Sequence, residues 1–289
     1  MVIFLYSDIK YEQAAISCVK SFERLIHDDL EVVYYTVDFD SDFSCKNLRK
    51  VRVEKKWYPS MLFYKPELTL LTLQLFPDEK HFLYCDTDVI YSRKFNFNVA
   101  KIDNLEYPLA PVGPFDFPFI WENVNGIYRE YKCEELMDYL NVPARTMKYV
   151  NTCFYIFGHE CRDFIEEWAS VCENRYLHSR PGGILYFPFR DEASFNVLLW
   201  KRKADKNLGK CYLNTTRLDA VRMCEEGNFE FMDPSEDKLG RGGVLKDGPV
   251  DIYGMNWESI EDPSNVIFYH GIKEKQASEE ILNYITSLA

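Results

Sequence analysis

Two carboxylates, Asp86 and Asp88, follow a short apolar run at residues 81–85, and a second apolar pair, Val89 and Ile90, comes directly after them. Side chains at positions i and i+2 of an extended chain point the same way, so both carboxylates can face one ion. Hard oxygen donors suit Mg²⁺ or Mn²⁺, which would also hold the phosphates of a substrate. The alternative is an ordinary polar turn at the end of a strand.

The chain carries a second set of acids at the same spacing, Asp38, Asp40 and Asp42. These acids run on into a polar stretch, residues 40–50, in which the composition predicts no strand. We therefore expect a solvated loop there. The apolar residues on both sides of Asp86 favour that later pair as the metal site.

Composition limits the class of partner. The 289 residues have a formal charge of −12, with 47% apolar and 16% aromatic residues. Such a chain can bury a large core. The negative charge argues against a nucleic-acid duplex or an anionic membrane as partner, because both require a positive face. A phosphate-bearing substrate would need another source of positive charge, and a metal held by acidic side chains would supply it.

The nine cysteines include no C-x-x-C pair and are odd in number, so neither a zinc framework nor a closed disulfide set is indicated. This pattern favours a reducing, cytoplasmic compartment. No stretch approaches the ~20 apolar residues that a membrane span requires. We therefore expect no transmembrane segment.

Strands and helices alternate along the chain. Apolar and β-branched runs predict strands at 2–6, 30–37 and 81–85, and helical spacing predicts helices at 11–26 and 60–76. The same alternation continues through 107–112, 147–158, 161–172, 183–189, 191–203, 266–271 and 278–288. This order predicts an α/β fold with a mainly parallel sheet covered by helices on both faces.

Two stretches interrupt the alternation. Residues 112–146 are rich in prolines, aromatics and charges, and we expect them to form an excursion over the edge of the sheet. Residues 233–256 are rich in Gly, Pro and charge, which predicts a mobile loop beside a site. We expect one domain over 1–289, with a nucleotide-binding half at 1–111 and a catalytic and acceptor half at 112–289.

Five further stretches place polar side chains at the end of a strand or the start of a helix: "FLYSDIKYEQAAISCVKSF" (4–22), "FYKPELTLL" (63–71), "YVNTCFYIFG" (149–158), "FRDEASFNVLLWK" (189–201) and "VIFYHGIKEKQ" (266–276). Together with "DTD" they resemble, in their order from residue 2 to about 275, nucleotide-sugar-dependent glycosyltransferases of the GT-A fold. The retaining families 8 and 6 are the most similar. The resemblance implies a GT-A, Rossmann-like mixed sheet.

The resemblance implies a donor site in the first half of the chain. Asp8 would contact the edge of a uracil base, and Tyr11 would stack on its ring. The alternative is helix capping by Asp8 and core packing by Tyr11. Lys65 would lie near the donor sugar and phosphates, where family 8 has an arginine, or it would be a solvated side chain. Asn151 would border the sugar pocket, or it would satisfy backbone groups at a strand end.

The resemblance also implies the catalytic residues. Asp191 and Glu192 match the family 6 pattern D-E-x-x-L-N, with Phe195 in place of the leucine. Glu192 would lie on the β-face of the anomeric carbon, as nucleophile or as stabiliser of an oxocarbenium-like transition state, and Asp191 would bind sugar hydroxyls. The alternative is a helix start that two acids favour through the helix dipole.

The last motif would complete the metal site. By the resemblance, His270 is the third metal ligand beside Asp86 and Asp88, and Lys273 binds the diphosphate. The spacing departs from the family pattern H-x-x-G-x-x-K, because Gly271 follows His270 directly. Lys275 is therefore an alternative to Lys273.

The implied function is transfer of a sugar from a UDP-sugar to an acceptor hydroxyl, with Mn²⁺ or Mg²⁺ as cofactor and retention of the anomeric configuration. The partners would be a nucleotide-sugar donor and a saccharide or glycoconjugate acceptor. If Glu192 were a general base, the enzyme would invert. A sugar-phosphate nucleotidylyltransferase is a further alternative, but its usual Gly-rich basic loop is absent from "SDIKYEQ". A non-catalytic carbohydrate-binding protein is the third.

Overall fold

The computed structural model describes most of the first two thirds of the chain and three strands beyond it. The described residues are 1–23, 30–87, 89–91, 105–110, 119–124, 127–144, 150, 152–179, 191–202, 219–223, 229–231 and 266–270. The loop expected at 233–256 and the helix expected at 278–288 lie outside these residues.

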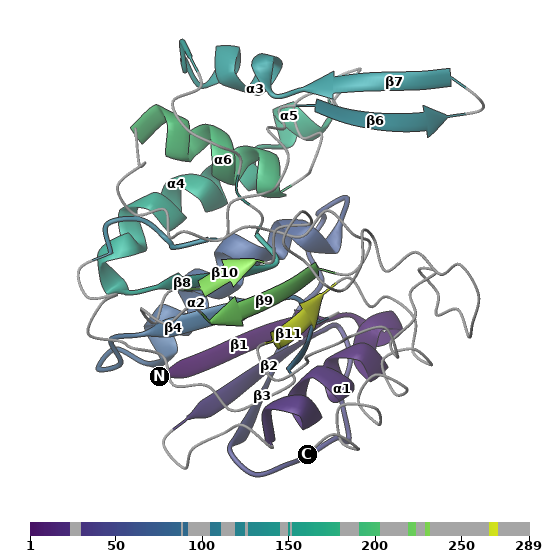
Figure 1. Cartoon of the computed structure of the whole chain (residues 1–289), viewed down its shortest axis with the longest axis vertical. Helices are drawn as coiled ribbons and strands as arrows, with labels where there is room; N and C mark the ends of the chain where they lie inside the picture. The colour runs from purple at the N-terminus through teal and green to yellow at the C-terminus, as the bar shows by residue number, and fades with distance from the viewer. Residues whose placement is uncertain are drawn as a thin grey trace.

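The main sheet has five strands in the order β3-β2-β1-β4-β8 (Figure 1). The first four strands are parallel, and β8 runs antiparallel to β4. The strands are β1 (Val2–Ser7), β2 (Glu31–Val37), β3 (Leu48–Val53), β4 (Phe82–Cys85) and β8 (Phe154–Phe157). The predicted α/β class with a mainly parallel, mixed sheet is confirmed.

The central strands and the edge strand differ in composition for a physical reason. β1, β4 and β8 are buried along their whole length, which explains their continuous apolar runs. β3 has the sequence LRKVRV, and its arginines and lysine are exposed. The prediction that no strand occurs within 40–50 was wrong, because β3 begins at Leu48. A charged, half-exposed edge strand lacks the apolar run that identifies a buried one.

Helices cover both faces of this sheet. The hydroxyls of Tyr35 and Tyr155 contact Thr72 and Thr69 of α2 (Lys65–Leu75) at 2.8 and 2.7 Å. On β4, Tyr84 stacks on Tyr155, toward α2. Its neighbour Cys85 points the other way, as alternation requires, and lies 3.9 Å (Sγ to Sγ) from Cys18 of α1 (Glu12–Glu23).

Two further helices pack beyond α2. α4 (Arg162–Cys172) contacts α2, and α6 (Asp191–Arg202) packs on α4. The ring of Phe195 lies 4.8 Å from that of Trp168 and 5.2 Å from that of Phe164, centroid to centroid. These side chains belong to one continuous cluster of buried residues that also includes the strands of the main sheet. The described helices are all too short or too polar to span a bilayer.

A second, antiparallel sheet has the order β10-β9-β11-β5. Its strands are β5 (Val89–Tyr91), β9 (Asp219–Met223), β10 (Phe229–Phe231) and β11 (Val266–His270). A separate hairpin of β6 (Phe119–Val124) and β7 (Ile127–Lys132) projects from the body of the molecule and leads into α3 (Glu134–Tyr139) (Figure 1). The excursion expected within 112–146 thus contains a regular hairpin.

Candidate active site

A buried lysine joins two of the predicted site residues. The Nζ atom of Lys65 lies 3.1 Å from Oδ1 of Asp86 and 3.2 Å from Oδ2 of Asp191. It also donates to the carbonyl oxygen of Thr152 at 3.1 Å and lies 3.3 Å from the Thr152 hydroxyl. The side chain of Lys65 is only 3% exposed, so the solvated alternative is excluded.

The elements explain why these side chains meet. Asp86 follows β4, where that strand leaves the sheet, and Asp191 is the first residue of α6. Lys65 is the first residue of α2, where a helix dipole disfavours a cation. The two carboxylates offset that cost as well as the cost of burying the charge. Pro66 lies in the first turn of α2, where its fixed φ suits the start of a helix.

The charges in this cluster are strongly coupled. Burial alone would lower the pKa of Lys65, but the carboxylates of Asp191 and Asp86 outweigh burial and hold the pKa well above its ordinary value. Burial raises the pKa of Asp191, although Lys65 opposes the shift. With all three groups ionised, one cation faces two anions. The cluster therefore keeps one net negative charge, which favours a further cation nearby.

Tyrosine rings form the wall of the cluster. The Tyr84 hydroxyl donates to Oδ1 of Asp86, and the Lys65 ammonium lies 5.2 Å from the centre of the Tyr84 ring. Tyr6 donates to the carbonyl oxygen of Met61 at 3.0 Å. Burial raises the pKa of Tyr6 and of Tyr84 well above the ordinary value. These hydroxyls therefore stay protonated and act as fixed hydrogen-bond donors.

Hydrogen bonds tie the start of α6 to the segment before β8. The Thr152 backbone N–H donates to Oε2 of Glu192 at 3.0 Å, and the Thr152 hydroxyl donates to Oδ2 of Asp191 at 3.1 Å. The Asn196 side chain makes two bonds to the backbone of Val150, at 2.7 and 2.8 Å. Sequence reasoning missed Thr152. The matched family pattern included Asn196 but did not indicate its role as a backbone bridge.

A buried indole fixes the first turn of α6 from the other side. Trp168 of α4 donates through Nε1 to the carbonyl oxygen of Asp191 at 3.0 Å. The same nitrogen lies 3.0 Å from the hydroxyl of Ser194. Asp191 is 1% exposed, whereas Glu192 is half-buried. Glu192 is therefore the more accessible of the two predicted catalytic acids.

The first predicted donor-binding turn is formed at the end of β1. Asp8 accepts a hydrogen bond from the Lys10 backbone N–H at 3.0 Å and begins η1 (Ile9–Tyr11), so the expected capping alternative is observed for Asp8. Tyr11 is 45% exposed, which excludes core packing for this ring. Contact of either residue with a base stays a prediction.

The remaining metal-site residues are described only in part. Asp86 has a side chain 21% exposed, but Asp88, Asn151 and Lys273 lie outside the described residues. The backbone of His270 pairs with that of Val89 through the antiparallel contact of β11 with β5. His270 thus stands opposite the residue that follows Asp88. No group of three His, Cys, Asp or Glu side chains within the described segments could hold a metal.

The second acidic set behaves as predicted. Asp38, Asp40 and Asp42 are exposed, and Arg52 of β3 lies 2.5 Å from Asp40 in a surface ion pair. Such a pair contributes little to stability. The interpretation of this set as a solvated loop is confirmed, although the strand β3 follows it.

No protein-family profile matches this sequence, and no curated protein matches it. Among solved structures, the chain is similar to the galactosyltransferase LgtC in complex with donor and acceptor sugar analogs, at 17% identity over 74% of each chain and a TM-score of 0.45. An active-site mutant of LgtC gives the same identity and TM-score, over 74% of this chain and 73% of the other. The apo structure of WbbM, a bifunctional glycosyltransferase, is similar at 14% identity over 70% of this chain and 38% of that chain, with a TM-score of 0.46.

Proposed function

We propose that this protein is a metal-dependent glycosyltransferase of the GT-A fold that transfers a sugar from a UDP-sugar to an acceptor hydroxyl with retention. The observation that carries the proposal is the pairing of β11 with β5. It brings the backbone of His270 opposite Val89, next to the D-x-D segment where β4 leaves the sheet. Residues far apart in the sequence thereby meet where α/β sheets bind ligands. The ordered motifs of the sequence support the same function.

The donor nucleotide would bind at the ends of β1 and β4, which are neighbours in the sheet. Tyr11 is half-exposed and offers a ring face to the base, while Asp8 begins the turn that carries it. Asn151 would border the sugar and Lys273 the diphosphate. In this arrangement the cluster of Lys65, Asp86 and Asp191, which has one net negative charge, would lie beside the phosphates of the donor. Because the cluster and the phosphates are both negative, a cation is needed between them.

Carboxylates and an imidazole are the donor types that Mn²⁺ accepts, so Asp86, Asp88 and His270 fit as its ligands. When bound, the metal would neutralise the negative charge that develops on the departing diphosphate. The chain's own part is to hold Asp86 in place. Lys65 and Tyr84 both bind its Oδ1 atom, which fixes the orientation of the carboxylate.

Glu192 is the acid we propose beside the anomeric carbon. The Thr152 N–H holds its carboxylate, and the buried Asp191 anchors the same turn of α6 through Lys65. A carboxylate fixed in this way can stabilise a developing oxocarbenium ion without first having to reorganise. The family resemblance implies that Asp191 binds sugar hydroxyls. Through its ion pair with Lys65, Asp191 would also hold the first turn of α6, and with it Glu192, in position.

The test is a panel of UDP- and GDP-sugars incubated with the protein, with and without Mn²⁺. We expect release of the nucleoside diphosphate from one UDP-sugar and a higher melting temperature with that donor, both dependent on the metal. Nuclear magnetic resonance of the product anomer then distinguishes retention from inversion. If no donor is hydrolysed and none raises the melting temperature, the proposed function is wrong. Release of pyrophosphate from UTP and a sugar 1-phosphate would favour the nucleotidylyltransferase instead.

A further inference from the structure

The large exposed apolar side chains of the described segments fall into two groups. Ile9 and Tyr11 belong to the proposed donor turn. Of the other three, Tyr176 lies in α5 (Arg175–Ser179), and the rings of Trp57 and Tyr139 contact side chains of α5. We name these three rings the α5 platform. They are 39%, 41% and 56% exposed, respectively. Exposed aromatic rings that gather in one place indicate a binding surface.

The rings of the α5 platform are held in place by neighbouring side chains. Tyr139 and Tyr176 stack on each other at 26°, with ring centroids 6.4 Å apart. The guanidinium of Arg175 lies 4.9 Å from the centre of the Trp57 ring. The Asn174 amide donates to the Tyr139 hydroxyl at 2.8 Å. Trp57, Tyr139 and Tyr176 are therefore each held by a neighbouring side chain, and polar groups lie beside the rings.

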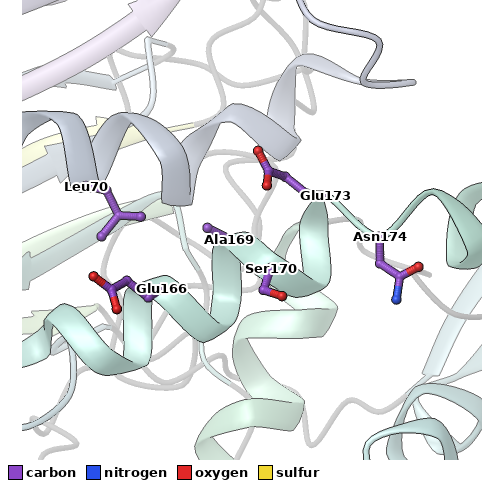
Figure 2. A pocket seen from close by; sticks show the side chains of 6 residues that line it. All are labelled: Leu70, Glu166, Ala169, Ser170, Glu173 and Asn174. Carbon is purple, nitrogen blue, oxygen red and sulfur yellow. The ribbon is translucent and has the colours of Figure 1, made fainter.

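A polar hollow adjoins the platform. It has a volume of about 500 Å³ and is open to solvent, between α2 and the C-terminal half of α4 (Figure 2). Its lining consists of Leu70, Glu166, Ala169, Ser170, Glu173 and Asn174. Asn174 belongs to both features, because it lines the hollow and holds Tyr139. The volume is within the usual range for small-molecule sites.

The charges in the hollow are already offset by neighbours. Glu173 lies 3.3 Å from the Lys56 ammonium and accepts from the Tyr58 hydroxyl at 3.1 Å. Glu166 lies 3.7 Å from the Arg162 guanidinium. Because cations neutralise the carboxylates of Glu166 and Glu173, these groups can accept hydrogen bonds from a neutral ligand. Acceptors, a hydroxyl and an amide beside flat rings complement a neutral polyol whose C–H groups can lie on an aromatic face.

We propose that the α5 platform and its hollow bind a neutral oligosaccharide. Resting on the proposed function, this ligand is the part of the acceptor chain that lies away from the reacting hydroxyl. A printed contact supports this placement: the Lys56 ammonium lies 2.8 Å from Glu67, two residues after Lys65 in α2, and 3.3 Å from Glu173 of the hollow. The hollow thus connects to the candidate active site through the first turn of α2.

The experiment measures binding of neutral oligosaccharides to the full chain by saturation-transfer magnetic resonance and calorimetry, without donor or metal. The probes are hexasaccharides of glucose in α-1,4 or β-1,4 linkage, of N-acetylglucosamine and of galactose. We expect at least one to bind. Tyr176→Ala should weaken that binding about tenfold, and Tyr176→Phe should preserve it, because the ring face supplies the contact.

Tyr11→Ala is the matched control, since it removes an exposed ring from the donor turn. It should leave oligosaccharide binding unchanged. The assay contains no donor. A negative result for oligosaccharide binding can therefore be distinguished from a negative result for hydrolysis of the donor. The inference is overturned if no probe binds, or if Tyr176→Ala binds as well as the unmodified chain. It is also overturned if Tyr176→Ala abolishes self-association instead, because the platform would then be an interface between two copies.

Discussion

Replacement of Lys65 by methionine tests whether the buried cation holds the site together. The substitution keeps most of the side-chain length but leaves Asp86 and Asp191 facing each other without the ammonium that lies 3.1 and 3.2 Å from them. Removal of one partner from a buried ion pair costs about 3–5 kcal/mol. Most of the loss should arise from Asp191, which is 1% exposed, because water partly solvates Asp86.

Equilibrium unfolding in urea measures this loss as a change in the free energy of unfolding. A chain of this kind has a total of about 5–15 kcal/mol, so the Lys65→Met protein should fold with little margin. The double variant Lys65→Met/Asp191→Asn removes one buried charge of each sign and should recover more than half of the loss. The single variant Asp191→Asn is the reference with which the double variant is compared. This comparison can still be made if Lys65→Met does not fold.

The dependence on pH gives a second measure of the same effect. Burial already raises the pKa of Asp191, and without Lys65 this pKa should rise further. A carboxyl whose pKa is higher in the folded state binds protons preferentially in that state, so stability falls as pH rises through the folded pKa. The deficit of Lys65→Met should therefore be smaller near pH 5 than near pH 8. A loss below about 1 kcal/mol, or a deficit that does not change with pH, would refute the reasoning.

Four other substitutions test the proposed donor, catalytic and metal-binding residues. Tyr11→Ala should weaken UDP binding about tenfold in calorimetry without a change in melting temperature, because the ring is half-exposed, and an unchanged affinity would exclude stacking. Glu192→Gln can keep the hydrogen bond from Thr152 and should lower turnover at least about 100-fold while the protein stays folded; normal turnover would remove the proposed role. Asp88→Asn should abolish the Mn²⁺-dependent rise in melting temperature, which His270→Gln should reduce, and an unaltered Mn²⁺ response in both would contradict the ligand set.

Sequence patterns predicted the buried parts of the fold well because burial leaves a strong signature. The continuous apolar runs of β1 and β4 and the amphipathic helix α4 lie where they were expected. β3 was missed, because a charged strand at the edge of a sheet resembles a loop in composition. β9 (DAVRM) and β10 (FEF) were also missed, because charged residues interrupt them and neither contains a continuous apolar run such as that of β4.

The candidate site was predicted as a set of residue types but not as a network. Asp86, Asp191 and Lys65 were each chosen by position in a motif, and the structure brings all three into contact. That Lys65 joins the two acids depends on tertiary packing between β4, α2 and α6, which local sequence does not encode. Thr152 was missed for the same reason, because its role depends on the approach of α6.

The chain leaves the main sheet after Cys85 and enters the second sheet at Val89. The acidic segment therefore links two separately hydrogen-bonded sheets, and β11 pairs with β5 directly after that link. A ligand that contacts residues of both sheets would hold the two sheets together across this segment. The segment between Cys85 and Val89 should consequently become more resistant to proteolysis as the concentration of such a ligand increases.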